Sequence, residues 1–152
     1  MRPTAVIPDT SALITLAKLD GLAWLPALFG RVLVAEAVAR EFGTALPPDM
    51  VLSAPTRTSG LPPLPAVLGA GEADALHLAA ETPGALLVLD DLEARRTAGR
   101  HHLPHVGCLR LLVLAKQRGL VPAVRPLALQ MQANGFRMSP ALFEWVCREA
   151  GE

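Results

Sequence analysis

The residues with the clearest potential for chemistry are carboxylates that directly follow short apolar runs. Asp9 follows residues 4–8, and Asp90 and Asp91 follow residues 85–89. Both runs have the length and composition of buried strands, and in parallel sheets functional sites lie beyond the carboxyl ends of the strands. We therefore expect these carboxylates to meet at one edge of a sheet.

Other carboxylates lie within segments whose apolar spacing predicts helices. In residues 35–42, Glu41 lies on or beside the apolar stripe, and in residues 70–81, Glu72 continues that stripe into the first turn. A carboxylate beside an apolar stripe is costly unless it has a partner such as a metal ion. For Glu72, attraction to the helix N-terminus is the alternative explanation, and Asp74 is predicted to be more exposed.

Only one of Asp90 and Asp91 is expected to face the site, because the side chains of successive residues point apart. Asp90 with Glu93 three residues later has the form of a capping box, which predicts that Asp90 caps the next helix. Asp91 has no such explanation and is preferred for the site. The predicted set is therefore Asp9, Glu41, Glu72 and Asp91, with Asp74 and Asp90 as alternatives.

Such a set predicts divalent cation chemistry. Converging carboxylates cannot all remain ionised unless cations neutralise them, and hard oxygen ligands select Mg²⁺ or Mn²⁺. These ions suit the hydrolysis of phosphodiesters.

The charge distribution fits this interpretation. Residues 1–93 carry 11 acidic and 5 basic side chains, whereas residues 94–143 carry 8 basic and no acidic ones. The basic part suits a nucleic-acid backbone, and solvated helix faces are the alternative interpretation.

The elements that position these acids alternate between strands and helices. Strands are expected at 4–8, 32–34, 85–89 and 105–107, and residues 43–65 form a long loop with one short extended piece at 51–54. This alternation predicts an α/β fold, a three-layer sandwich with a central parallel sheet, helices on both faces and a helical C-terminal tail.

Composition excludes other classes of protein. The chain has 152 residues, no formal net charge and 51% hydrophobic residues, which suits one ordinary domain rather than a disordered chain. Its apolar runs fall short of the roughly 18 residues needed to cross a bilayer. Two cysteines make no disulfide framework, so the cytoplasm is the expected location.

Four segments, taken in order, resemble the PIN-domain family and its VapC-type toxin ribonucleases in particular. They are VIPDTS at 6–11, VAEAVAREF at 34–42, GEADAL at 71–76 and LLVLDDLEAR at 86–95. The tail from residue 119 is similar to a PIN subgroup that ends in two extra helices. The resemblance implies a nuclease domain over 1–118 and a helical extension over 119–152, packed on the same domain or in an interface.

The resemblance also implies a function. It is that of a metal-dependent endoribonuclease, the toxin of a toxin–antitoxin pair, held inactive by a small antitoxin protein and forming a homodimer. Asp9 matches the first acid of the family, Glu41 the second, Glu72 or Asp74 the third and Asp91 or Asp90 the fourth. Ser11 matches the hydroxyl residue that supports the first acid. The residues expected to contact the RNA backbone follow the last acid on one helix: Arg95, Arg96 and Arg100.

Two alternatives remain. The first is a PIN fold that binds RNA or a partner but cleaves weakly. The second is a zinc site made from His101, His102, His105 and Cys108, whose spacing matches no common zinc finger. A surface or phosphate-contacting loop is the preferred interpretation of that cluster.

Overall fold

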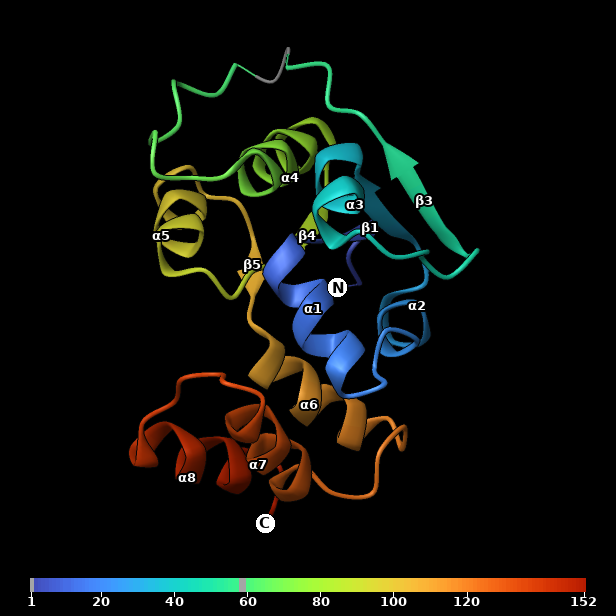
Figure 1. The fold of residues 1–152 in the computed structure, drawn as a ribbon, viewed down its shortest axis with the longest axis vertical. Coiled ribbons are helices and arrows are strands. Elements are labelled where there is room, and N and C mark those ends of the chain that lie inside the picture. The colour runs from blue at the N-terminus through green and yellow to red at the C-terminus, as the bar shows by residue number, and fades with distance from the viewer. Residues whose placement is uncertain (1, 58–59) are drawn as a thin grey trace.

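The computed structural model describes residues 2–57 and 60–152, whose fold is shown in Figure 1. A five-stranded parallel sheet in the order β3-β2-β1-β4-β5 forms its centre. Its strands are β1 (Ala5–Pro8), β2 (Val32–Ala35), β3 (Met50–Ser53), β4 (Ala85–Val88) and β5 (His105–Val106). The predicted α/β sandwich is confirmed.

Helices flank this sheet. They are α1 (Thr10–Lys18), α2 (Trp24–Phe29), α3 (Glu36–Phe42), α4 (Ala70–Glu81), α5 (Leu92–Arg100), α6 (Cys108–Gln117), α7 (Arg125–Ala133) and α8 (Pro140–Glu149). The helix α2 packs against β1 and β2, while α4 packs against β1, β2 and β4. Helix α3 contacts both α1 and α4, so three helices that follow different strands meet at one end of the sheet.

The inner strands form because they are short apolar runs buried on both faces. Every residue of β1 and β2 is buried, as expected of parallel strands covered by helices on each side. The edge strand β3 differs, because Val51 and Leu52 are 50% and 55% exposed. The sequence predicts only a short extended piece in a loop here, whereas the structure has a strand in register with β2.

The register of the sheet aligns the two strands that precede the predicted acids. Pro8 of β1 pairs with Val88 of β4, and the two strands run in parallel. Asp9 therefore leaves the sheet beside Leu89, with Asp90 one residue further on. This alignment brings the acids that follow residues 8 and 88 to the same edge.

The C-terminal helices share the core of the sheet domain. Helices α7 and α8 lie at the lower end of Figure 1, next to α6. Their contribution to the core is a set of fully buried side chains, namely Val124, Ala128, Met131, Val146 and Cys147. Other apolar side chains of these helices are 37–52% exposed, namely Leu129, Leu142 and Trp145.

The carboxylate of Glu152 links the C-terminal helices to α6. The side chain of Glu152 accepts hydrogen bonds from the backbone N–H groups of Val124 (2.6 Å) and Arg125 (2.9 Å) and from Lys116 Nζ (3.0 Å). It joins the end of α8, the start of α7 and the last turn of α6. These hydrogen bonds lower the pKa of Glu152 to about 2, and the bond from the N–H of Val124 has the largest effect.

Replacing Glu152 with Gln should therefore destabilise the fold. Its pKa is about 2 when folded against an ordinary 4.5, so its stabilisation is complete above pH 4.5 and lost as the pH falls toward 2. We expect Glu152→Gln to lower the Tm by about 5 °C at pH 7, with the difference shrinking below pH 4.5.

Thermal unfolding followed by circular dichroism measures this change. Glu149→Gln, which changes an exposed acid in the last turn of α8, is the matched control and should melt like the wild type. Equal melting temperatures for Glu152→Gln and wild type at pH 7 would contradict the role assigned to Glu152.

Candidate active site

Asp9 is the most buried acid of the site, directly after the middle strand β1. Its side chain is fully buried, and its Oδ1 accepts a 2.8 Å hydrogen bond from the N–H of Ala12, which caps α1. Its Oδ2 is buried with no hydrogen-bond partner among residues 2–57 and 60–152. One oxygen of Asp9 is thus used by the fold, and the other is available to a ligand.

Asp90 shows the same division between its two oxygens. Its Oδ1 accepts a 2.9 Å hydrogen bond from the N–H of Cys108, the first residue of α6. In the part of the chain that the structure describes, its buried Oδ2 has no partner. A Cβ at Gly107 would lie only 3.3 Å from Asp90 Oδ1, so glycine at that position leaves room for the contact.

The prediction that Asp90 caps α5 is wrong. The cap is Asp91, whose Oδ2 accepts a 2.9 Å hydrogen bond from the N–H of Ala94. Because the helix begins at Leu92, Glu93 is its second residue rather than its third, and the capping box does not form. Asp90 is therefore available for its contact with α6, and the argument that preferred Asp91 to Asp90 no longer holds.

Burial and neighbouring carboxylates act together on Asp9. The pKa of Asp9 is raised to about 7, mainly by burial and to a smaller extent by the charges of Asp90, Glu72 and Asp91, against the lowering effect of its bond from Ala12. Four of the predicted acids thus lie close enough to interact electrostatically. Repulsion among them makes the region a favourable place for a cation.

Glu72 reaches this region from the first turn of α4. Its Oε2 lies 2.6 Å from the point that a Cβ would occupy at Gly69, so the carboxylate folds back over the start of its own helix. Attraction to a helix N-terminus, the alternative explanation for this residue, fits that position. Its proximity to Asp9 places it at the site as well.

Glu41 lies beside this group and already has protein partners. The sequence predicts it beside the buried stripe of its helix, but the residue is exposed. Its Oε2 accepts from Thr10 Oγ1 and its Oε1 from the N–H of Gly71, both at 2.7 Å. A Cβ at Gly71 would stand 2.6 Å from Glu41 Oε2, so only glycine permits this approach. Thr10 and Gly71 are contributors that the sequence analysis missed.

Asp74 has a basic partner, and Ser11 makes no hydrogen bond to Asp9 within residues 2–57 and 60–152. Asp74 forms an ion pair with Arg57 of the loop that crosses α4. Ser11 is exposed in the first turn of α1. The hydroxyl that bonds to an acid is that of the preceding residue, Thr10.

The three arginines on α5 differ in their surroundings. Arg95 is exposed, and its Nη1 lies 3.3 Å from the point that a Cβ would occupy at Gly107, the same distance as Asp90 Oδ1. Arg96 pairs with Glu93 at 3.3 Å, and Arg100 donates to Thr97 Oγ1 at 3.1 Å. Arg95 is thus the arginine placed beside Asp90.

In the part of the chain that the structure describes, His101, His102, His105 and Cys108 form no group of three that could hold a metal ion. Cys108 is fully buried at the start of α6, and burial, with the charge of Asp90, raises the pKa of its thiol. His105 Nδ1 lies 3.0 Å from the carbonyl oxygen of Leu103, while His102 is exposed at the end of α5.

The donor set fits a hard divalent cation. Among the described residues, one buried carboxylate oxygen of Asp9 and one of Asp90 lack partners, and Glu72 and Asp91 are close enough to affect Asp9 electrostatically. Within the described ranges, no three His, Cys, Asp or Glu side chains are grouped closely enough to hold a metal ion as they stand. A third carboxylate ligand would therefore have to move toward the oxygens of Asp9 and Asp90 when a cation binds.

A parallel α/β sheet with a buried carboxylate after its middle strand and a second one after the neighbouring strand is an arrangement suited to binding a divalent cation. A family model described as a PIN domain matches residues 5–152, and the chain belongs to the PIN-domain family. PIN domains are typically metal-dependent nucleases. No curated protein and no solved structure matches the chain. In the described part of the chain, no helix is long and apolar enough to span a membrane.

The raised pKa of Asp9 predicts a stability effect with a definite sign. A folded pKa of about 7 against an ordinary 3.8 means that the contribution of Asp9 to stability falls as the pH rises between these values. Asn keeps the capping oxygen without the charge. We expect metal-free Asp9→Asn to melt about 5 °C above wild type at pH 8 and at the same temperature at pH 4.

Thermal unfolding in EDTA at both pH values measures this difference. Asp20→Asn serves as the control, because Asp20 is exposed and has a φ of 54° that Asn also adopts readily. If Asp9→Asn and the wild type have the same melting temperature at pH 8, the ionised side chain of Asp9 does not destabilise the fold.

Proposed function

We propose that this chain is a metal-dependent endoribonuclease, a VapC-like toxin of a toxin–antitoxin pair that hydrolyses RNA phosphodiesters. The observation that carries the proposal is the pair of buried carboxylate oxygens without partners, on Asp9 and Asp90 at adjacent strand ends. Membership of the PIN-domain family supports it, since such domains commonly act as ribonucleases of this kind.

Each acid has a distinct part in the proposed site. Asp9 and Asp90 would hold Mg²⁺ or Mn²⁺ with their Oδ2 atoms, while Glu72 and Asp91 add negative charge or complete the ligand set. Glu41 of α3 is held by Thr10 and by Gly71 at the start of α4, so it would support the site by joining these helices. Asp74 is assigned no metal, because Arg57 already neutralises it.

The protein groups around the acids suit an RNA phosphate. When bound, a divalent ion supplies Lewis acidity toward a phosphate and toward water. Arg95 stands beside Asp90 with an exposed guanidinium, which can bind a non-bridging phosphate oxygen. The bonds from Ala12 and Cys108 fix the two carboxylates, so that their remaining oxygens are held in place before a ligand arrives.

We further propose that this chain has the two partners expected of such a toxin, a second copy of itself and an antitoxin protein. Residues 119–152 form a helical extension of the nuclease domain at 1–118, and the chain acts in the cytoplasm. Exposed apolar side chains on α7 and α8, Leu129, Leu142 and Trp145, provide a surface for a second copy of the chain. A small antitoxin protein would inhibit the assembled enzyme.

Calorimetric titration with Mn²⁺ tests the metal site without knowledge of the RNA sequence. We expect wild type and Asp20→Asn to bind Mn²⁺, and Asp9→Asn and Asp90→Asn to bind it roughly 100-fold less tightly. Cleavage of a fluorescent single-stranded RNA pool in Mn²⁺ should fall by at least about 100-fold in the same two variants. Mn²⁺ binding and cleavage that survive in Asp9→Asn would contradict the proposal. RNA binding without cleavage in wild type would favour a catalytically weak RNA-binding module.

Comparison of the neighbouring aspartates separates their roles. Asn is a good helix cap, so Asp91→Asn preserves the start of α5 and should weaken Mn²⁺ binding by less than tenfold. Asp90→Asn removes an oxygen that has no other partner and should have the larger effect. The reverse order of the two effects, measured in the same titration, would move the metal assignment back to Asp91.

A further inference from the structure

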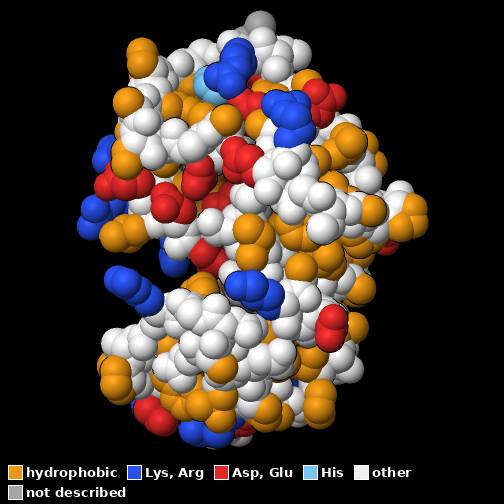
Figure 2. Space-filling view, in the orientation of Figure 1, with side chains coloured by type: hydrophobic (Ala, Val, Ile, Leu, Met, Phe, Trp, Pro, Cys, Tyr) orange, Lys and Arg blue, Asp and Glu red, His pale blue; other side chains and the backbone are white. Residues whose placement is uncertain are grey.

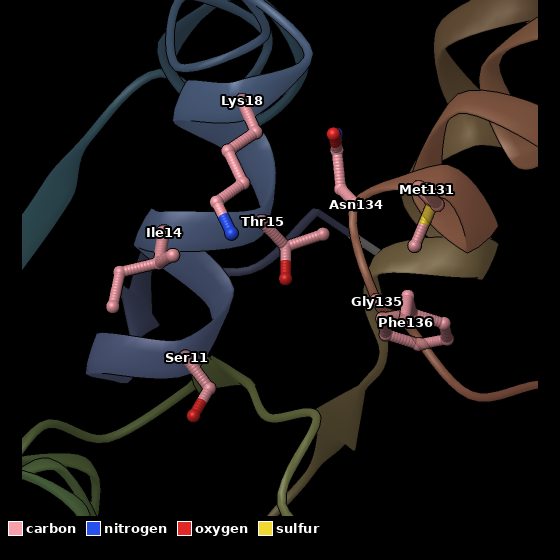
Figure 3. A pocket seen from close by; sticks show the side chains of 8 residues that line it. All are labelled: Ser11, Ile14, Thr15, Lys18, Met131, Asn134, Gly135 and Phe136. Carbon is pink, nitrogen blue, oxygen red and sulfur yellow. The ribbon is translucent and has the colours of Figure 1, made fainter.

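A groove lies between α1, the helix that Asp9 caps, and the end of α7. It has a volume of about 220 Å³. On one side it is lined by Ser11, Ile14, Thr15 and Lys18, and on the other by Met131, Asn134 and Phe136. Figure 3 shows the two sets of side chains on the two segments, with Thr15 extending from α1 toward the segment that carries Met131 and Phe136. We call it the α1–α7 groove.

The spacing along α1 explains its side of the groove. Residues at positions 11, 14, 15 and 18 repeat at three and four residues, so they share one face of the helix. This face is incompletely covered, since Ile14 is 40% exposed. Asp9 caps the same helix, so the groove begins within its first turn, at Ser11, and extends about 10 Å to Lys18.

The opposite side is fixed by the way α7 ends. Gly135 has a φ of 97°, and its N–H donates to Gln132 O at 3.0 Å while the N–H of Phe136 donates to Met131 O at 2.9 Å. This is a Schellman motif, which holds Phe136 beside Met131. Gln130 Nε2 also donates to the carbonyl oxygen of Lys18 at 3.1 Å, so the two helices are joined at the end of the groove.

The lining has the chemistry of a site for single-stranded nucleic acid. Phe136 offers an aromatic ring for a base, Asn134 an amide that can read a base edge, and Lys18 an ammonium group for a phosphate. None of the residues that line the groove is acidic. The wall formed by α7 belongs to the segment 94–143, which contains basic residues and no acidic ones.

The surface view connects the groove with the acids. Figure 2 shows acidic side chains gathered above a notch that separates the sheet domain from the C-terminal helices, with Lys and Arg side chains at its edges. An RNA strand whose phosphate lies at the acids would thus have a polar and basic path toward the C-terminal helices. An apolar peptide would leave Lys18 and the hydroxyls of Ser11 and Thr15 without matching groups.

We propose that the α1–α7 groove binds a nucleotide of single-stranded RNA next to the phosphate at the metal site. Its base stacks on Phe136 and meets the amide of Asn134, and a backbone phosphate binds Lys18. The C-terminal extension thereby determines which RNA is bound. The position relative to a cleaved phosphate rests on the proposed function, whereas binding of RNA in the groove does not.

The test is fluorescence anisotropy with short 5′-fluorescein-labelled oligoadenylate and oligouridylate in EDTA, where metal-dependent cleavage is prevented. We expect Phe136→Leu to weaken binding about fivefold or more, because Leu keeps the apolar contact but offers no ring. Lys18→Gln should reduce the slope of log K against log salt by about 0.7. Asn134→Ala should reduce the difference in affinity between the two oligomers.

Arg40→Gln is the matched control, because Arg40 is exposed on α3 and does not line the groove. It should change neither affinity nor salt slope. Lys18 contacts Gln130 only through its backbone carbonyl, so Lys18→Gln remains informative even if Phe136→Leu melts early. Wild-type affinity in both Phe136→Leu and Lys18→Gln would overturn the inference, as would a wild-type chain that binds neither oligomer.

The outcomes separate this inference from the proposed function. Weaker RNA binding in the groove variants, together with no Mn²⁺-dependent cleavage by wild type, would support the groove and contradict the nuclease. Mn²⁺ binding and cleavage that remain at wild-type level in Phe136→Leu and Lys18→Gln, with unchanged RNA affinity, would support the nuclease and overturn the groove.

Discussion

The site depends on a carboxylate that the fold buries at the end of its middle strand. Because β1 lies between β2 and β4 and is covered by helices, the side chain of the residue that follows it is fully buried. Asp9 occupies that position, and the acids near it raise its pKa further. A buried carboxylate with acidic neighbours destabilises a fold unless protons or cations neutralise it. The affinity for a cation and the cost in stability therefore have the same origin.

Hydrogen bonds to the first turns of helices also position the acids of the candidate site. Asp9 and Asp90 each use one oxygen to bond the first turn of a helix, α1 in one case and α6 in the other. A side chain held by such a bond has few orientations left, so its second oxygen is held in place as well. The bonds that complete the helices thus also set the geometry of the candidate site, and the same is true of Glu41 and the first turn of α4.

The apolar runs at 4–8 and 85–89 were enough to predict the central strands, the edge at which the acids meet and the α/β architecture. Predictions from local sequence patterns were wrong where the partner of a residue lies far along the chain. Asp90 has the spacing of a capping box, but its partner Cys108 lies 18 residues away, beyond β5. Glu41 belongs to a helix of 7 residues, too short for periodicity to define its exposed side, and its partner Gly71 lies 30 residues away. The strand β3 depends on pairing with β2, which its Pro-rich surroundings conceal.

The hydrogen bond between Asp90 and the N–H of Cys108 links the charge of the site to the start of α6. Helix α6 in turn carries the C-terminal helices, which share its core. A change in the charge or position of Asp90 must alter the chemical shift and the hydrogen-exchange rate of the Cys108 amide. The amide of Cys108 is therefore a natural spectroscopic reporter of the site: its NMR resonance would register cation binding at Asp90 with no label attached to the acids themselves.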